Sequence, residues 1–450
     1  MKRNNAKATN KNQILKTKVH KQLIYSVLFK FISMVLVFLT TSFVNKYLGE
    51  NEYGLWAAIY SFISWVYLLD FGFANVIKTK LPVKILEKKE NETNELVTTI
   101  YVGVGIIALT IIIIFCILNF ISTPSEFFNV KASSINFNFL LSINLLFSIL
   151  ILIIGNHKSL FVGVLKTHLV EFSLMLIQLL IFASIFTISR FNILLFESKI
   201  INVSIVYGFV NVFVGIIFTF YFFKKHNNIK ISFKYFNFSV LKENIGLGLN
   251  FFIIQVCMII IYSTDHFLIL KYFGSKEVGQ FDIVFKLFQV PMLLITAGLS
   301  PFWSIFSKAY AEKKYLWIKK VFYIYNFSFI LFIIGMFILN YMLNDIIIFW
   351  IDKQIIFSNT LLISLSIYIT LISYASIYSF FLNGVNKINL SMRIIVFQAI
   401  VNLPICLLLI KKGYGIEGVI IGNCLCILPA SVMTPLQSFC IINKKIKARV

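Results

Sequence analysis

The sequence predicts an all-α integral membrane protein whose twelve transmembrane helices form two parallel six-helix lobes, with the N and C termini in the cytoplasm. Three observations carry this prediction: the composition, the placement of the basic residues, and an internal repeat. Of the 450 residues, 59% are hydrophobic and only 13% are charged. Soluble chains are about half apolar and about a quarter charged, so we expect a bilayer around this chain. That expectation excludes a soluble enzyme, a nucleic-acid-binding domain and a secreted disulfide scaffold.

Apolar segments of about 20 residues, each long enough to cross a bilayer as a helix, recur along the whole chain. We place them at 22–44, 54–76, 97–120, 136–156, 169–188, 200–223, 246–270, 280–300, 321–342, 358–382, 391–410 and 415–438. The six cysteines lie in or beside these segments, and none has the spacing of a metal site. We therefore expect no metal.

The basic residues set the orientation of these spans. If the N terminus is cytoplasmic, the cytoplasmic segments hold 29 of the 41 Lys and Arg residues and the external segments hold 9. Such an excess is typical of cytoplasmic loops. The remaining three, Lys30, Lys286 and Arg393, fall within spans. The formal net charge of +23 is therefore interpreted as topological charge, and we expect no nucleic-acid partner.

An internal repeat relates the two halves of the chain. Residues 46–54 (KYLGENEYG) match residues 271–279 (KYFGSKEVG) at five of nine positions, with an offset of 225. Residues 163–169 (GVLKTHL) match 384–390 (GVNKINL) at four of seven, with an offset of 221. Six crossings return the chain to its starting side, so the two halves share one orientation, as in transporters with parallel repeats. Interhelical turns also favour Gly and Lys, which is the alternative explanation of these matches.

The spans and the repeat predict a domain organisation of five parts. They are a basic cytoplasmic segment (1–21), an N-lobe with spans 1–6 (22–223), a cytoplasmic linker (224–245), a C-lobe with spans 7–12 (246–438) and a basic cytoplasmic tail (439–450). Two like-oriented lobes that enclose a central cleft suit transport by alternating access.

Three cations within spans are candidates for binding substrate in that cleft. Lys30 lies about 12 Å into span 1 at the rise of an α-helix, and Lys286 and Arg393 lie in spans 8 and 11. A charge at membrane depth is costly and usually faces protein or a wet cavity. Such cations suit an anionic or phosphate-bearing substrate. Snorkelling of Lys30 and Arg393 to the membrane surface is the alternative.

Three aspartates are candidates for a polar network or for coupling to an ion. Asp282 lies four residues before Lys286, a spacing that places both on one helix face, where they can neutralise each other. Asp70 lies near the cytoplasmic end of span 2, and Asp265 near the external end of span 7. For these two, a helix-terminal or network role is as compatible with the sequence as direct contact with a ligand.

Several short segments resemble a known family. YGLW at 53–56, SW at 64–65 and LDFGFAN at 69–75 resemble the Wzx-type O-antigen and polysaccharide flippases of the multidrug/oligosaccharidyl-lipid/polysaccharide (MOP) exporter superfamily. TDHFLI at 264–269, followed by Gly274 and Gly279, resembles the span-7 region of that family. The resemblance implies a MATE/MOP-like fold. It also implies a membrane transporter and not an enzyme.

The resemblance further implies a substrate and a location. Such proteins move undecaprenyl-diphosphate-linked oligosaccharide, the repeat unit of O-antigen or another surface polysaccharide, from the cytoplasmic to the outer leaflet of the bacterial inner membrane. The family binds the diphosphate with cations of its cavity; Lys30 matches these in type and span, and Lys286 and Arg393 in type only. No cofactor is implied, although a Na⁺ or H⁺ gradient is an expected energy source. The implied partners are the lipid-linked glycan, membrane lipids and other polysaccharide-assembly proteins.

Two other functions remain open from the sequence. A cation-coupled multidrug exporter could have the same fold, but such exporters rely on intramembrane acids, whereas the spans here also contain lysines. A membrane-embedded glycan polymerase or ligase would need a large external loop with catalytic residues. The longest external gap here has about 15 residues, which disfavours that class.

Overall fold

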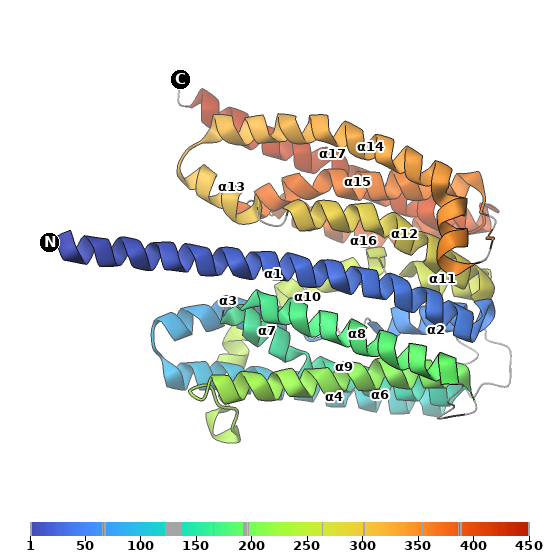
Figure 1. The fold of residues 1–450 in the computed structure, drawn as a ribbon, viewed down its shortest axis with the longest axis horizontal. Coiled ribbons are helices and arrows are strands. Elements are labelled where there is room, and N and C mark those ends of the chain that lie inside the picture. The colour runs from blue at the N-terminus through green and yellow to red at the C-terminus, as the bar shows by residue number, and fades with distance from the viewer. Residues whose placement is uncertain are drawn as a thin grey trace. The chain divides into compact units, whose positions relative to one another are not determined.

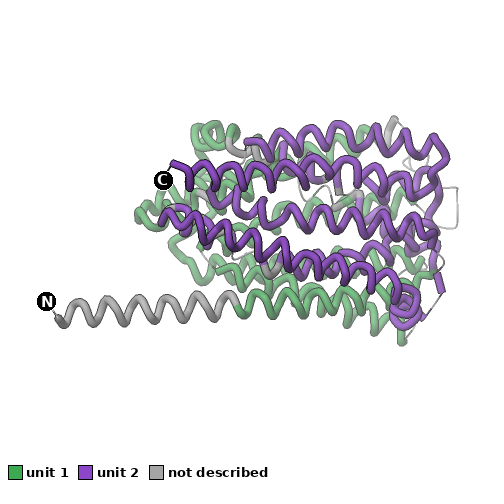
Figure 2. The backbone as a smooth tube through the Cα atoms, turned by 90° about the horizontal axis from the view of Figure 1, so that it is seen from above, with its two compact units in different colours: residues 1–49, 63–252 green, residues 50–62, 253–450 purple. Residues whose placement is uncertain are grey.

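The computed structural model describes residues 2–448 apart from 65, 67–68, 122–136, 165, 192–195, 197, 263, 300–301, 353, 356, 386 and 388. The described residues form α-helices and one short 3-10 helix, and they contain no strand (Figure 1). They divide into two compact units, which Figure 2 distinguishes by colour. Unit 1 comprises residues 1–49 and 63–252, and unit 2 comprises 50–62 and 253–450.

Unit 1 contains most of the helices of the N-terminal half. They are α1 (Lys2–Leu48), α3 (Phe73–Leu86), α4 (Glu90–Ile121), α6 (Phe137–Ile154), α7 (Asn156–Gly163), α8 (Thr167–Phe191), α9 (Lys199–Lys225), η2 (Phe233–Tyr235) and the first part of α10 (Phe238–Tyr262). Helix α1 packs along α8, α9 packs against α6, and α3 packs against α7 and α4. The expected linker, 224–245, comprises the end of α9, η2 and the start of α10, and it lies within this unit.

Unit 2 combines one helix from the N-terminal half with the C-terminal half. Its helices are α2 (Glu50–Ser64), α11 (Thr264–Tyr272), α12 (Ser275–Leu299), α13 (Phe302–Ala311), α14 (Tyr315–Ile351), α15 (Asn359–Gly384), α16 (Asn389–Lys411) and α17 (Glu417–Lys447). Helix α17 packs against α15 and α16, while α12 and α13 pack on α15. Buried rings of Phe306, Phe322 and Phe381 pack edge to face where α13, α14 and α15 meet, and the ring of Tyr378 packs at a tilt against Phe322.

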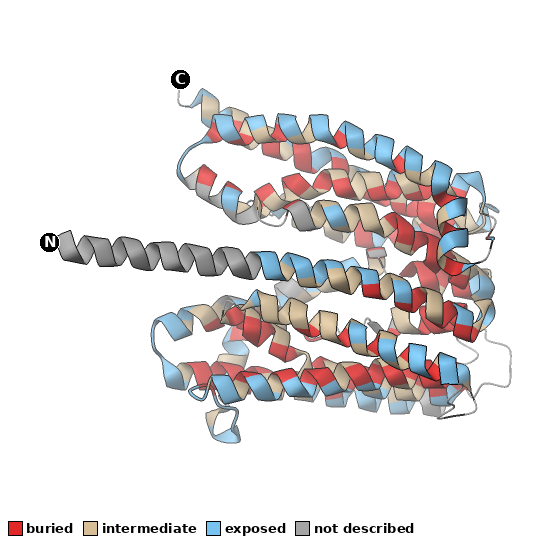
Figure 3. Ribbon diagram, in the orientation of Figure 1, coloured by how far each residue is buried: buried red, intermediate tan, exposed pale blue. Residues whose placement is uncertain are grey.

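The outer faces of the helices are apolar, which identifies a multi-pass membrane protein. Phe349 on α14 is 93% exposed and Tyr341 is 91% exposed, and Figure 3 shows the exposed residues along α14. A soluble protein rarely exposes so large an apolar surface. Ten helices among the described residues are long and apolar enough to cross a membrane. The predicted all-α membrane fold is therefore confirmed, whereas the number of twelve crossings stays a prediction.

The second expected span, 54–76, is not one continuous helix. It consists of α2 and α3, and the chain turns between them at Phe71 and Gly72, whose φ angles are 50° and 72°. The carboxylate of Asp70 accepts hydrogen bonds from the backbone N–H of Gly72 (3.0 Å) and Ala74 (2.8 Å). These donors at the start of α3 have no partner within their own helix, so Asp70 stabilises the beginning of α3.

The two copies of each matched segment share a backbone feature at their described residues. Gly49 and Gly274 follow α1 and α11 with φ angles of 79° and 110°, which glycine adopts without the steric cost of a Cβ. The ends of α7 and α15 share an equivalent backbone hydrogen bond. The N–H of Lys166 donates to the carbonyl of Phe161 (2.8 Å), and that of Lys387 donates to Leu382 (2.9 Å), in each case five residues back.

The start of α2 and the start of α12 meet in a reciprocal contact. A Cβ built on Gly54 would lie 1.6 Å from the carbonyl oxygen of Ser275, and one on Gly279 would lie 2.9 Å from that of Glu50. With the offset of 225, Ser275 corresponds to Glu50 and Gly279 to Gly54. A contact in which each copy presents the same surface to the other is the signature of two-fold symmetry.

Candidate functional site

Helices α2, α11 and α12 of unit 2 gather three polar side chains around Asp282. The chain reverses at Gly274 between α11 and α12, so His266, eight residues before this turn, comes beside Asp282, eight residues after it. The glycine contact described above brings α2 close enough for Tyr53 to reach the same carboxylate. Lys286 lies one turn beyond Asp282 on α12. We call Tyr53, His266, Asp282 and Lys286 the Asp282 cluster.

Hydrogen bonds connect all four members of the Asp282 cluster. His266 Nε2 lies 3.0 Å from Asp282 Oδ1, and Lys286 Nζ donates to Asp282 Oδ2 over 2.6 Å. The Tyr53 hydroxyl donates to Asp282 Oδ2 and accepts from Lys286 Nζ over 3.0 Å. Tyr53, His266 and Asp282 are buried, whereas the side chain of Lys286 is 24% exposed.

The geometry of the cluster leaves Lys286 available to a second anion. Asp282 receives three donors, so its charge does not depend on Lys286 alone. A lysine ammonium has three donor protons. Two of them point to Asp282 and Tyr53, which leaves a third donor proton on a side chain that is 24% exposed. The pairing that the i,i+4 spacing predicts is present.

A second chain of polar groups in unit 2 starts at Asp265. Both of its carboxylate oxygens accept from Asn423 Nδ2 on α17, over 3.0 and 2.9 Å. Asn423 Oδ1 in turn accepts from Asn402 Nδ2 on α16 over 2.7 Å. The thiol of Cys406 lies 3.8 Å from the same oxygen. We call Asp265, Asn402 and Asn423 the Asp265 chain.

Asp265 is buried, with an exposed fraction of 1%, and within the described part of the chain it forms no ion pair. The neighbouring His266 interacts with it electrostatically but directs its Nε2 to Asp282. Among the described residues, the oxygen Oδ1 of Asn402 is also buried without a hydrogen-bond partner. A buried carboxylate needs a proton or a cation to be stable, so the Asp265 chain is able to hold either.

The other two predicted cations lie outside these clusters. Lys30 is exposed on α1 in unit 1, where it interacts electrostatically with Glu171 of α8. Arg393 is exposed near the start of α16, and no hydrogen bond or ion pair of the described residues joins it to Lys286. The structure thus brings Lys286 together with Asp282. A common site for all three predicted cations stays a prediction, since Lys30 belongs to unit 1 and the other two belong to unit 2.

The remaining predicted acid, Asp70, has the helix-terminal role described above. The hydrogen bonds from Gly72 and Ala74 come from the backbone of the residues that begin α3. Lys78, one turn and a half further along α3, interacts electrostatically with the same carboxylate. These contacts explain why an acid lies in this apolar region, and they involve no external ligand.

Sequence reasoning missed the amide members of the Asp265 chain and the role of Tyr53. Asn402 and Asn423 lie within apolar segments, where polar side chains commonly hydrogen-bond across helices. Their position in apolar segments indicates that both asparagines belong to a polar network. It does not predict the partner, since Asn423 and Asp265 are 158 positions apart. Tyr53 is 229 positions from Asp282.

Comparison with known proteins supports the fold. The sequence matches no family model and no curated protein. An inward-facing structure of a multidrug resistance MATE family transporter of the MOP superfamily matches with a TM-score of 0.76 and 13% identity, over 95% of this chain and 100% of that one. A MATE protein in a bent conformation matches with a TM-score of 0.65 and 14% identity, over 97% and 98%.

A third solved structure with a similar fold is known for the polarity of its binding pocket. It is a MOP superfamily transporter from Pyrococcus furiosus, reported with a binding pocket of reverse polarity. It matches with a TM-score of 0.65 and 14% identity, over 95% of this chain and 96% of that one. At these identities the likeness establishes the fold. The chain therefore has the MATE-like fold of MOP superfamily transporters, as the sequence predicts.

Proposed function

We propose that this protein is a flippase that moves polyprenyl-diphosphate-linked oligosaccharide, a repeat unit of O-antigen or another surface polysaccharide, to the outer leaflet by alternating access. Lys286 is the observation that carries the proposal. A site for cationic drugs gains nothing from the positive charge of a partly exposed lysine side chain, whereas a diphosphate gains a charge-assisted hydrogen bond. The family resemblance of residues 53–75 and 264–279 points to the same substrate class.

The Asp265 chain supports coupling of this transport to a cation gradient. A buried carboxylate that forms no ion pair is destabilising as an uncompensated charge, and binding of a proton or Na⁺ removes that cost. Asp265 lies next to His266 of the Asp282 cluster, and both residues begin α11. Occupation of Asp265 can therefore shift the helix that holds part of the substrate site, provided that the cation binds the two transport states unequally.

The proposal includes a cellular setting. The substrate lipid resides in the inner membrane of a bacterium, so the protein belongs there, together with the other proteins that assemble the polysaccharide. The polyprenyl tail can stay in the bilayer while the diphosphate and sugars pass along the protein. Substrate must bind both facing states with comparable affinity, because unequal binding would trap the transporter in one of them.

Complementation of a strain that lacks the protein tests this function. Wild type should restore the surface polysaccharide, and Lys286→Ala should lower it by about ten-fold or more at equal protein level, since a charge-assisted hydrogen bond contributes about 1.5–3 kcal/mol. Lys286→Arg keeps the charge and should retain most of the activity. Lys320→Ala, at an exposed lysine on α14, is the matched control. Full activity of Lys286→Ala would remove the site from the proposal.

A multidrug exporter is the second candidate, and Asp265 is the observation that favours it. Solved structures of this fold include multidrug resistance transporters, and a buried carboxylate without a counter-ion is able to attract a cationic drug. Drug susceptibility separates the two candidates. A flippase predicts that the deletion strain loses surface polysaccharide with unchanged susceptibility to cationic drugs, whereas broad sensitisation with intact polysaccharide would establish the exporter.

A further inference from the structure

A basic pocket lies in unit 1, at the junction of α3 with α4 and at the end of α9. It has a volume of about 590 Å³, within the range of small-molecule sites. The polar residues of its wall that matter here are Lys84, Lys88, Lys89, Lys225, His226 and Asn228. None of these takes part in the Asp282 cluster or the Asp265 chain. We call this cavity the basic pocket.

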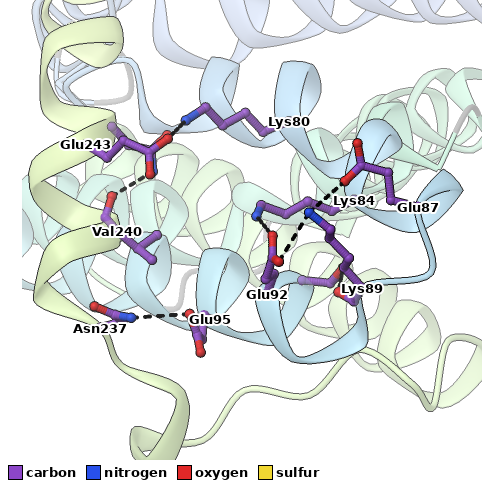
Figure 4. A network of polar contacts seen from close by, with 11 residues as sticks. Lys80, Lys84, Glu87, Lys89, Glu92, Glu95, Asn237, Val240 and Glu243 are labelled. Atoms are coloured by element: carbon purple, nitrogen blue, oxygen red, sulfur yellow. Dashed lines mark hydrogen bonds and ion pairs between the residues drawn. The ribbon is translucent and has the colours of Figure 1, made fainter.

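The carboxylates around the basic pocket are already engaged by other groups. Figure 4 shows Lys84 and Lys89 directed at Glu92, over 2.8 and 3.3 Å, and Lys89 also at Glu87. Glu90, which lies in the wall, accepts from Asn228 over 2.9 Å. On the same face, Glu95 accepts from Asn237 and Glu243 pairs with Lys80.

Two lysines of the wall keep their charge uncompensated. Within the described part of the chain, neither Lys88 nor Lys225 forms an ion pair. Lys225 donates to the hydroxyl of Tyr221, a neutral group, over 2.8 Å. Lys88 has a left-handed backbone with φ of 57°, a conformation that is uncommon for lysine and that recurs at functional sites.

Lys166 and His226 at the edge of the basic pocket share a hydrogen bond, with 3.3 Å between Lys166 Nζ and His226 Nε2. Burial, together with the positive charges of Lys166 and Lys225, lowers the pKa of His226, and burial together with Lys225 lowers the pKa of Lys166. The positive charge of Lys225 disfavours protonation of its neighbours, and a bound anion would offset this effect. Together with the two lysines of the wall that form no ion pair, it points to an anionic ligand.

The surroundings of the basic pocket favour a lipid as the source of that anion. The candidate membrane spans of α4 and α9 are Glu90–Leu118 and Lys199–Lys225, so the pocket lies at one end of both, where a membrane helix meets the headgroups. Leu86, in the segment between the wall residues Ile85 and Lys88, is 82% exposed. Basic pockets between membrane helices on the cytoplasmic side are suited to lipid headgroups. We propose that the basic pocket binds the phosphodiester headgroup of an anionic phospholipid.

The test titrates the purified full-length protein in a non-ionic detergent with phosphatidylglycerol and, separately, with phosphatidylcholine, and measures bound lipid by native mass spectrometry. The double variant Lys88→Asn, Lys225→Gln removes both charges. Asparagine tolerates the left-handed backbone at position 88 and glutamine keeps α9 helical. Removal of two lysines should weaken phosphatidylglycerol binding by roughly 30-fold, with little effect on phosphatidylcholine.

Two controls make the result decisive. The double variant Lys444→Gln, Lys445→Gln removes the same charge from an exposed part of α17 and should bind as wild type does. Lys88→Arg, Lys225→Arg keeps the charge and should retain binding, which excludes misfolding as the cause of a loss. A third arm adds inorganic phosphate, which should not compete at millimolar concentration. Equal phosphatidylglycerol binding by the charge-removing pocket variant and wild type, or displacement of the lipid by inorganic phosphate, would overturn the proposal.

Discussion

Gly54 and Gly279 occupy equivalent positions of the internal repeat and pack against each other. The Cβ that a larger residue would place at Gly279 comes within 3.3 Å of the Cα of Gly54. The contact has two consequences. It brings α2 against the start of α12, and it positions Tyr53, the residue before Gly54, for its hydrogen bond to Asp282. Small residues at such positions let helix backbones approach closely in membranes.

Replacement of Gly54 by alanine should therefore destabilise the protein. The new Cβ would lie 1.6 Å from the carbonyl oxygen of Ser275, and backbone cannot move aside cheaply. Overpacking of this kind costs about 1–3 kcal/mol. The measurement is thermal unfolding in detergent. Gly335→Ala on α14, where nothing lies within 4 Å, is the control and should be neutral or slightly stabilising. An unchanged melting temperature in Gly54→Ala would show that the two helices are not this close.

The Asp282 cluster predicts strong coupling between Asp282 and Lys286. Lys286→Met alone leaves a buried carboxylate with fewer donors, and Asp282→Asn alone leaves an ammonium without its counter-ion. The double variant Asp282→Asn, Lys286→Met removes both charges together. Residues in one polar network show coupling energies of about 0.5–3 kcal/mol. A double-mutant cycle of unfolding free energies should therefore be non-additive, with the double variant more stable than the sum of the two losses. Strict additivity would mean that the pair does not interact.

The Asp265 chain predicts a response of stability to monovalent cations. A ligand that binds only the folded state stabilises the protein. Once the ligand concentration exceeds the dissociation constant, the free energy of unfolding rises with the logarithm of that concentration. If Na⁺ occupies the Asp265 chain, NaCl should raise the melting temperature above that in choline chloride at equal ionic strength. Asp265→Asn should abolish this difference while it preserves the hydrogen bonds of the chain. Asp345→Asn, at an exposed site on α14, should leave the difference intact.

A proton as the coupling ion predicts another pattern in the same experiment. Wild type would then show no specific effect of NaCl. The stabilities of wild type and Asp265→Asn would diverge as the pH rises, because only wild type has a buried carboxyl group that must lose its proton. Identical behaviour of the two proteins in both salts and at every pH would contradict a coupling role for Asp265.

His226 should titrate below its ordinary pKa of 6.5. Burial and the charges of Lys166 and Lys225 disfavour the imidazolium, so the neutral ring accepts a hydrogen bond from Lys166 at pH 7. Because the folded state holds the pKa below the unfolded value, His226 contributes stability that is present above that value and is lost as the pH falls through the folded pKa. Proton NMR of labelled histidine measures the titration. Lys166→Gln should raise the pKa of His226, and Lys234→Gln should not.

The sequence was sufficient for the fold class and for the local pairs, because both depend on near neighbours. Composition and apolar segments predicted an all-helical membrane protein, and the repeat located Gly54 and Gly279 at corresponding positions. The spacing of Asp282 and Lys286 predicted their ion pair. In each case the physical determinant is a pattern within one helix or a match between two short segments.

The contacts between helices could not be predicted in the same way. Asp265 meets Asn423 because α11 and α17 pack together, and nothing within either segment identifies the other. The break between α2 and α3 was missed because the residues around Asp70 are apolar enough to continue a span, although Asp70 and Gly72 are residues that favour helix starts and turns. The positions of Lys30 and Arg393 along their helices likewise did not predict which way the side chains face, and both are exposed.

Transport by purified protein tests the central proposal most directly. The protein is reconstituted in liposomes that carry a polyprenyl-diphosphate-linked glycan in both leaflets, and a membrane-impermeant glycosidase digests the glycan from outside. A flippase predicts digestion of nearly all the glycan with wild type and of only about half with Lys286→Ala, because the inner leaflet then remains protected. Digestion of only half with wild-type protein, in liposomes that are sealed and contain folded transporter, would contradict the account.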